Sequence, residues 1–124
     1  MAGVRQALAA ALASPTGTAP LADLVRPGQR IAISVCDITR AQPRPLMLEA
    51  LFAALPHVSP GDVTILIATG THRANTPEEL ARMLGPEIAG RHRVVNHDAR
   101  DDASLAFAGR TASDMPIWLN RHWV

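Results

Sequence analysis

Two polar tetrapeptides hold the side chains best suited to chemistry: Asp37-Ile38-Thr39-Arg40 and Gly70-Thr71-His72-Arg73. Each follows a short run rich in β-branched residues, at positions 31–35 and 63–67. Such apolar runs are typical of strands buried on both faces, and ligands of open α/β sheets bind outside the carboxyl ends of the strands. We therefore expect a carboxylate, a hydroxyl, a guanidinium and an imidazole to converge there, which is a set fit for reactive chemistry.

His72 is the residue in these tetrapeptides best suited to proton transfer. It follows Gly70 and Thr71 at the end of a predicted strand. A histidine in such a position can act as a general base or a general acid near neutral pH. The alternative is a structural histidine that fixes the next helix by hydrogen bonding, and the flexible residues before it favour the catalytic role.

Asp37 and Arg40 form the second half of the predicted site. The Arg40 guanidinium offers a planar fork for a carboxylate or a phosphate. Asp37 could orient a neighbouring donor or accept a hydrogen bond from a ligand hydroxyl. Because the two residues are three apart in a loop, a local ion pair without function is the alternative.

Other candidate residues have simpler interpretations. Within Asn96-His97-Asp98, His97 could be a second catalytic group, but a structural turn is favoured. The five histidines show no metal-ligand spacing, so we expect no metal to be held by this chain alone. The single cysteine, Cys36, excludes an internal disulfide and is interpreted as a small buried hydrophobe.

Composition narrows the classes of function. The 124 residues suffice for one domain, 1–124, and the net charge of +1 argues against a nucleic-acid or anionic-membrane partner. All twelve basic residues are arginine, so no lysine can act as a base or tether a cofactor. No stretch reaches transmembrane length, and a cytoplasmic location is expected.

The periodicity of apolar residues predicts alternating helices and strands. The helix over 77–84 has the clearest start, because Thr76-Pro77-Glu78-Glu79 is a capping box with proline at the first helical position. Helices are expected over 3–13, 21–25, 46–55 and 77–84, and strands over 30–35, 63–68, 93–96, 105–108 and 115–119.

Turns are expected at 42–45 and at 109–111, and Gly85-Pro86 is expected to end a helix. The order predicts an α/β fold: a Rossmann-like three-layer sandwich with a mostly parallel central sheet. No glycine-rich dinucleotide fingerprint follows the first strand, so NAD in its usual binding mode is disfavoured.

Four stretches together resemble the N-terminal domain of the nickel-dependent lactate racemase family. They are Val35 to Arg40, Ile67 to Arg73, Thr76 to Leu80 and Arg93 to Ala99, and their order and spacing match along nearly the whole chain. Ala41 departs from the pattern, because the family usually has proline directly after its D-x-T-R motif. The resemblance implies a 2-hydroxy acid racemase or epimerase that uses a nickel-pincer nucleotide.

The resemblance also implies residue roles. His72 resembles the catalytic base that takes the substrate hydroxyl proton, and Asp37 a neighbouring active-site acid. Arg40 resembles the clamp on the substrate carboxylate, with Arg73 as a further substrate contact. Implied contacts to the cofactor come from Thr39, Gly70 and Thr71.

Members of the family carry a second half with the cofactor-tethering lysine, the nickel-binding histidine and a partner base. We therefore expect this chain to need that C-terminal domain or a partner subunit, and to have no racemase activity alone. One rival hypothesis is a non-catalytic Rossmann-like module that binds a small organic anion through Arg40 and Arg73. Another is a functionless fragment that associates through its exposed last strand.

Overall fold

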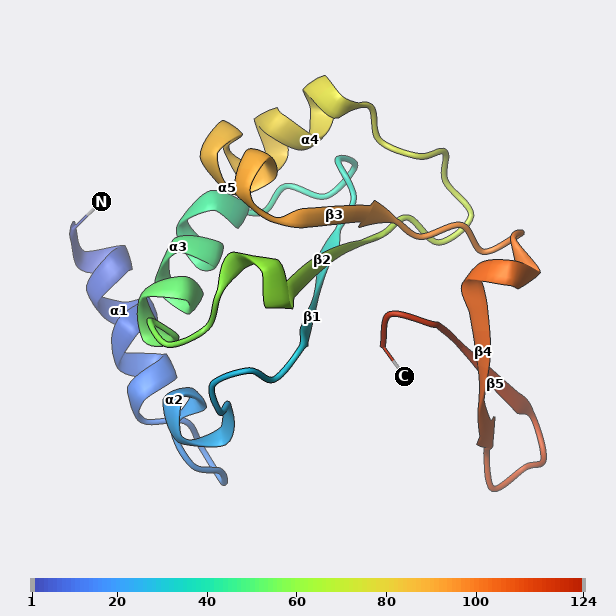
Figure 1. Ribbon diagram of the computed structural model, residues 1–124, viewed down its shortest axis with the longest axis horizontal. Coiled ribbons are helices and arrows are strands. Elements are labelled where there is room, and N and C mark those ends of the chain that lie inside the picture. The colour runs from blue at the N-terminus through green and yellow to red at the C-terminus, as the bar shows by residue number, and fades with distance from the viewer. Residues whose placement is uncertain (1, 124) are drawn as a thin grey trace.

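A three-stranded parallel sheet forms the centre of the fold (Figure 1). The computed structural model describes residues 2–123 and places the strands in the order β1 (Ile31–Cys36), β2 (Val63–Ala68) and β3 (Arg93–Asn96). The β-branched runs form the first two strands, paired in parallel from Ile31 with Val63 to Cys36 with Ala68. The predicted α/β class with a parallel central sheet is confirmed.

The helices gather on one side of this sheet (Figure 1). The reason is topological: the crossovers from β1 to β2 and from β2 to β3 step in the same direction, and crossovers share one hand. Both connections therefore place their helices over the same face, and the first helix of the chain packs against the helix of the first connection. The helices are α1 (Ala2–Ala13), α2 (Leu21–Leu24), α3 (Arg44–Ala54), α4 (Pro77–Leu84) and α5 (Pro86–Arg91).

The aliphatic core lies between β2 and this helix layer. Alternate β2 residues Val63, Ile65 and Ile67 are fully buried and pack with residues of α3 and α4. Side chains alternate between the faces of a strand, and neighbouring β1 shows the result: Ser34 is exposed, whereas Ile33 packs against the core. Each buried aliphatic side chain contributes roughly 1.5–3 kcal/mol.

The predicted capping box at the start of α4 is confirmed. The Thr76 hydroxyl accepts a hydrogen bond from the Glu79 amide at 3.2 Å, and the Glu79 carboxylate accepts one from the Thr76 amide at 2.9 Å. Two backbone donors of the first turn are thereby satisfied. This cap fixes the point at which the loop after β2 becomes helical.

Two helix boundaries differ from the prediction because proline starts helices as well as ending them. α3 begins at Arg44, inside the turn expected over 42–45, with Pro45 in its first turn. Gly85 does end α4, but Pro86 then opens α5, a helix that was not predicted. Proline lacks an amide hydrogen, which the first turn of a helix does not need.

The last two predicted strands do form, but they lie apart from the main sheet. β4 (Leu105–Arg110) and β5 (Pro116–Asn120) form a separate antiparallel hairpin (Figure 1). The connection between them is too short for a parallel crossover. β4 also continues into the turn expected at 109–111, with a bulge between Phe107 and Gly109, whose φ is +126°.

Candidate active site

The carboxyl ends of β1 and β2 lie side by side and present both polar tetrapeptides at one edge of the sheet. Cys36 and Ala68, the last residues of these strands, are in register. Asp37 follows the first directly, and the turn that carries His72 follows the second. The predicted meeting of these two loops is confirmed, because their side chains are hydrogen-bonded to each other.

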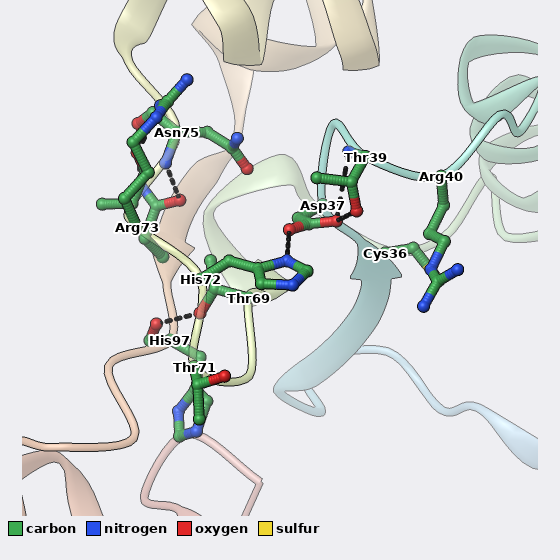
Figure 2. A network of polar contacts seen from close by, with 12 residues as sticks. Cys36, Asp37, Thr39, Arg40, Thr69, Thr71, His72, Arg73, Asn75 and His97 are labelled. Atoms are coloured by element: carbon green, nitrogen blue, oxygen red, sulfur yellow. Dashed lines mark hydrogen bonds and ion pairs between the residues drawn. The ribbon is translucent and has the colours of Figure 1, made fainter.

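The centre of the site is the pair formed by Asp37 and His72 (Figure 2). Nδ1 of His72 lies 2.6 Å from Oδ2 of Asp37. The other carboxylate oxygen accepts two hydrogen bonds from Thr39, at 2.6 Å from the hydroxyl and at 3.2 Å from the amide. Asp37 is buried, whereas 52% of the His72 side chain is exposed. A fixed carboxylate thus holds an imidazole that faces outward.

These contacts also keep Asp37 ionised. The Thr39 hydroxyl hydrogen bond is the largest cause of a lowered Asp37 pKa, followed by the hydrogen bond from His72, while burial opposes both. An ionised carboxylate can only accept hydrogen bonds, so His72 must carry a proton on Nδ1. In the neutral ring this leaves the lone pair on Nε2, which is the arrangement that a general base needs.

Backbone geometry of the loop after β2 aims the imidazole. Gly70 has φ +59°, in the left-handed region where glycine carries no steric cost, and the His72 amide closes the turn on the Thr69 carbonyl at 3.0 Å. Thr69 is itself buried and donates its hydroxyl hydrogen to the His97 carbonyl. The predicted cofactor residue Gly70 is therefore placed to shape the turn.

The two predicted substrate-binding arginines lie in different surroundings. The Arg40 side chain is exposed, and none of the hydrogen bonds drawn in Figure 2 involves its guanidinium. Arg73 instead donates two hydrogen bonds to Glu79, at 2.7 and 2.8 Å, which raises the pKa of Arg73. In this conformation the Arg40 fork is exposed but lies on the other side of the Asp37 turn from His72 (Figure 2), whereas the fork of Arg73 is occupied.

The remaining candidates divide between the site and its surroundings. Thr39 uses its hydroxyl on Asp37, so its role here is to hold the carboxylate. Thr71 is exposed beside His72 (Figure 2). The His97 ring bonds to Asn120 at 3.1 Å, which agrees with the structural interpretation favoured for that cluster.

Two supporting features were missed by the sequence analysis. Arg44 is buried and donates hydrogen bonds to backbone carbonyls of the Asp37 turn. Asn75 and Asn96 bond reciprocally: the Asn96 side chain accepts from the Asn75 amide at 2.9 Å and donates to its carbonyl at 3.1 Å. Neither set of contacts has a sequence signal, because the partners are backbone groups that only the tertiary structure brings within reach.

The family model described as the lactate racemase N-terminal domain matches residues 2–124. The chain belongs to this family. The family resemblance expected from the sequence motifs is thereby confirmed.

Two curated relatives of this lactate racemase N-terminal domain are named lactate racemase. The protein from Lactiplantibacillus plantarum is 33% identical over 111 residues, which is 89% of this chain and 26% of that protein. The protein from Thermoanaerobacterium thermosaccharolyticum is 31% identical over 112 residues, or 90% and 26% of the two chains. The chain thus spans about a quarter of the length of these relatives.

Solved structures show the same fold. The lactate racemase apoprotein from Thermoanaerobacterium thermosaccharolyticum superposes with a TM-score of 0.81 at 30% identity, covering 95% of this chain and 28% of that one. A crystal structure of a protein from Thermotoga maritima gives a TM-score of 0.70 at 22% identity, covering 95% and 29%. The second likeness supports the fold alone.

The described part of this lactate racemase N-terminal domain does not fit a metal by itself. Across residues 2–123 no three histidine, cysteine, aspartate or glutamate side chains converge in a way that could hold a metal ion. The chain also has no lysine that could tether a cofactor. No helix in the same range is long and apolar enough to span a membrane.

Proposed function

We propose that this chain supplies the proton-transferring half of a 2-hydroxy acid racemase or epimerase active site of the lactate racemase type. The observation that carries the proposal is the 2.6 Å hydrogen bond between His72 Nδ1 and the buried carboxylate of Asp37. Membership of the lactate racemase N-terminal domain family supports it. The substrate class is a small 2-hydroxy acid.

In this proposal His72 acts through Nε2. The Nδ1–H group donates a hydrogen bond to Asp37 and keeps its proton, so Nε2 can take the proton of a substrate hydroxyl that lies within hydrogen-bond distance. Asp37 stabilises the imidazolium that results and stays ionised because Thr39 holds its other oxygen. The same ring can return the proton to the product oxygen.

Arg40 binds the substrate carboxylate in this proposal. Its guanidinium is exposed at the turn that begins with Asp37, and a planar fork binds a carboxylate through two parallel hydrogen bonds. A 2-hydroxy acid has its hydroxyl on the carbon next to the carboxylate. Figure 2 shows the Arg40 guanidinium on the other side of the Asp37 turn from His72, so the proposal requires the exposed Arg40 side chain to swing toward the imidazole when substrate binds.

The family resemblance implies a nickel-pincer nucleotide, which would accept and return the hydride of the substrate carbon when bound. We propose that polypeptide beyond residues 2–123, in the same chain or in a partner, supplies its ligands, because the described residues offer no metal-ligand set. The residues of this chain then bind substrate and move its proton. By the same reasoning the chain alone is inactive. A cytoplasmic location remains part of the proposal.

The proposal is tested with His72→Gln in the longest natural polypeptide that carries this chain, loaded with its cofactor. Loss of a general base lowers kcat by about 10²- to 10⁴-fold. His57→Gln is the matched control. His57 lies in the connection between α3 and β2, outside the two site loops, and its ring bonds to the Val25 carbonyl at 2.7 Å. Turnover of D- and L-lactate by His72→Gln at the control rate would refute the proposal.

The exposed fork of Arg40 also favours a second candidate, a module that binds an organic anion without catalysis. Two variants of the same protein distinguish the two functions. Arg40→Gln weakens lactate binding under both, whereas His72→Gln abolishes turnover and leaves binding intact only if the site is catalytic. Binding without measurable turnover in the cofactor-loaded wild type would favour the module.

A further inference from the structure

We propose that Arg44 is a positioning residue that holds the Asp37 turn in the conformation required by His72. Arg44 is the first residue of α3 and only 6% exposed, yet its guanidinium turns back toward the preceding loop. The inference depends on the geometry of the Asp37–His72 pair and is independent of the reaction proposed above. It assigns a role to a residue that the sequence motifs do not include.

Three backbone carbonyls receive the Arg44 guanidinium. Nε donates to the carbonyl of Cys36 at 2.9 Å, and Nη2 donates to the carbonyls of Asp37 and Arg40, the latter at 2.5 Å. These carbonyls belong to the last residue of β1 and to the two ends of the turn that follows. The Arg40 amide also bonds to the Asp37 carbonyl at 3.3 Å. Arg44 thus ties both ends of the turn to the end of the strand.

A helical requirement does not explain an arginine at this position. A cation at a helix N-terminus opposes the helix dipole, and the first turn of α3 has no acidic residue to compensate. No salt bridge within residues 2–123 involves Arg44. A buried guanidinium is costly unless its donors are satisfied. Here three backbone carbonyls accept hydrogen bonds from Nε and Nη2, so the turn, rather than an acidic side chain, holds the guanidinium.

Asp37 connects the turn held by Arg44 to His72. The Asp37 carbonyl is held by Arg44, and its side chain leaves the same residue toward Thr39 and His72. If the turn relaxes, the carboxylate no longer meets Nδ1 at a fixed distance. The His72 ring then loses the acceptor that selects its tautomer.

The guanidinium shape matters as well as its charge. Arginine presents donors in a rigid planar fork that can serve several carbonyls at once, whereas lysine is a single charged point on a flexible stem. Arg44→Lys should therefore keep the charge but reach fewer of the carbonyls. This gives a graded series of wild type, Arg44→Lys and Arg44→Met.

The test measures the tautomer of neutral His72 from the ¹⁵N chemical shifts of its two ring nitrogens in the labelled 124-residue chain. We expect one Nδ1–H tautomer in the wild type, partial loss of it in Arg44→Lys, and a mixture of tautomers in Arg44→Met. Arg82→Met is the matched control, since Arg82 is exposed in the last turn of α4. Its spectrum should match the wild type.

A folded Arg44→Met that keeps a single Nδ1–H tautomer would overturn the proposal. If Arg44→Met does not fold, the decision falls to Arg44→Lys, and an unchanged tautomer in that variant overturns it equally. A purely structural Arg44 would lower the unfolding temperature and leave the tautomer unaltered. The tautomer is read without any turnover, so a racemase proposal that fails in the His72→Gln experiment leaves this result standing.

Discussion

Asp37→Asn is the substitution that most directly tests the carboxylate–imidazole pair. The amide keeps the size of the side chain but replaces one acceptor oxygen by an NH₂ donor. The Thr39 amide lies 3.2 Å from Oδ1 and cannot accept a hydrogen bond, so the oxygen of the asparagine must stay on that side. The NH₂ group therefore faces Nδ1 of His72, in the place of the oxygen that now lies 2.6 Å away.

The expected result is a reversed tautomer at modest cost in stability. Nδ1 of His72 must now accept a hydrogen bond from the NH₂ group, so the ring proton moves to Nε2. Nε2 then has no lone pair with which to take a substrate proton. A hydrogen bond to a charged group contributes about 1.5–3 kcal/mol, and its replacement by a neutral bond retains part of that. We expect a loss of about 1–2 kcal/mol, or roughly 3–10 °C in the unfolding temperature of a domain of this size.

The assays are the ring ¹⁵N chemical shifts of the isolated chain and the turnover of the complete, cofactor-loaded protein. The corresponding substitution in serine proteases lowers kcat by about 10⁴-fold through the same tautomer error, and we expect a loss on the order of 10³- to 10⁴-fold. Asp98→Asn is the control, because the Asp98 carboxylate accepts a local hydrogen bond from the Arg100 amide and does not contact His72 in the structure of residues 2–123. A folded Asp37→Asn that keeps Nδ1–H and normal turnover would refute the reasoning.

Four further predictions concern the frame of the site. Ile65→Ala removes a fully buried side chain and should lower the free energy of unfolding by about 2–5 kcal/mol, measured by urea denaturation. Thr76→Ala removes the α4 cap and should cost about 1 kcal/mol, with Thr18→Ala in the exposed loop between α1 and α2 as the control. The hydrogen bond from Arg73 is the main cause that lowers the pKa of Glu79 to about 2. The stability that Glu79 adds is therefore present above its unfolded pKa of 4.5 and is lost as the pH falls toward 2. Glu79→Gln should weaken the pH dependence of the free energy of unfolding in that window. Arg73→Gln should also reduce the pH-dependent part of the free energy of unfolding and leave the KM for lactate unchanged. A large rise in KM would show that Arg73 binds substrate after all.

The sequence alone determined the elements that carry the site. The β-branched runs of β1 and β2 predict strands because branched side chains suit a pleated, buried surface, and the capping box predicts the start of α4 from four adjacent residues. Parallel strands end at a common edge, so the positions of Asp37 and His72 just beyond them were enough to predict their meeting. These inferences succeed because their causes are local or follow from the direction of the strands.

Other features depend on which residues become neighbours in space, so only the tertiary structure decided them. Arg44 is buried because three carbonyls of a preceding loop accept its donors, and no spacing in the sequence marks such a partner. The Arg73 guanidinium donates its hydrogen bonds to Glu79, six residues later. The last two strands form their own hairpin because a short connection allows only antiparallel pairing. Local propensity determines where helices and strands form. Which side chains become hydrogen-bond partners depends on the donors and charges that the tertiary structure brings together.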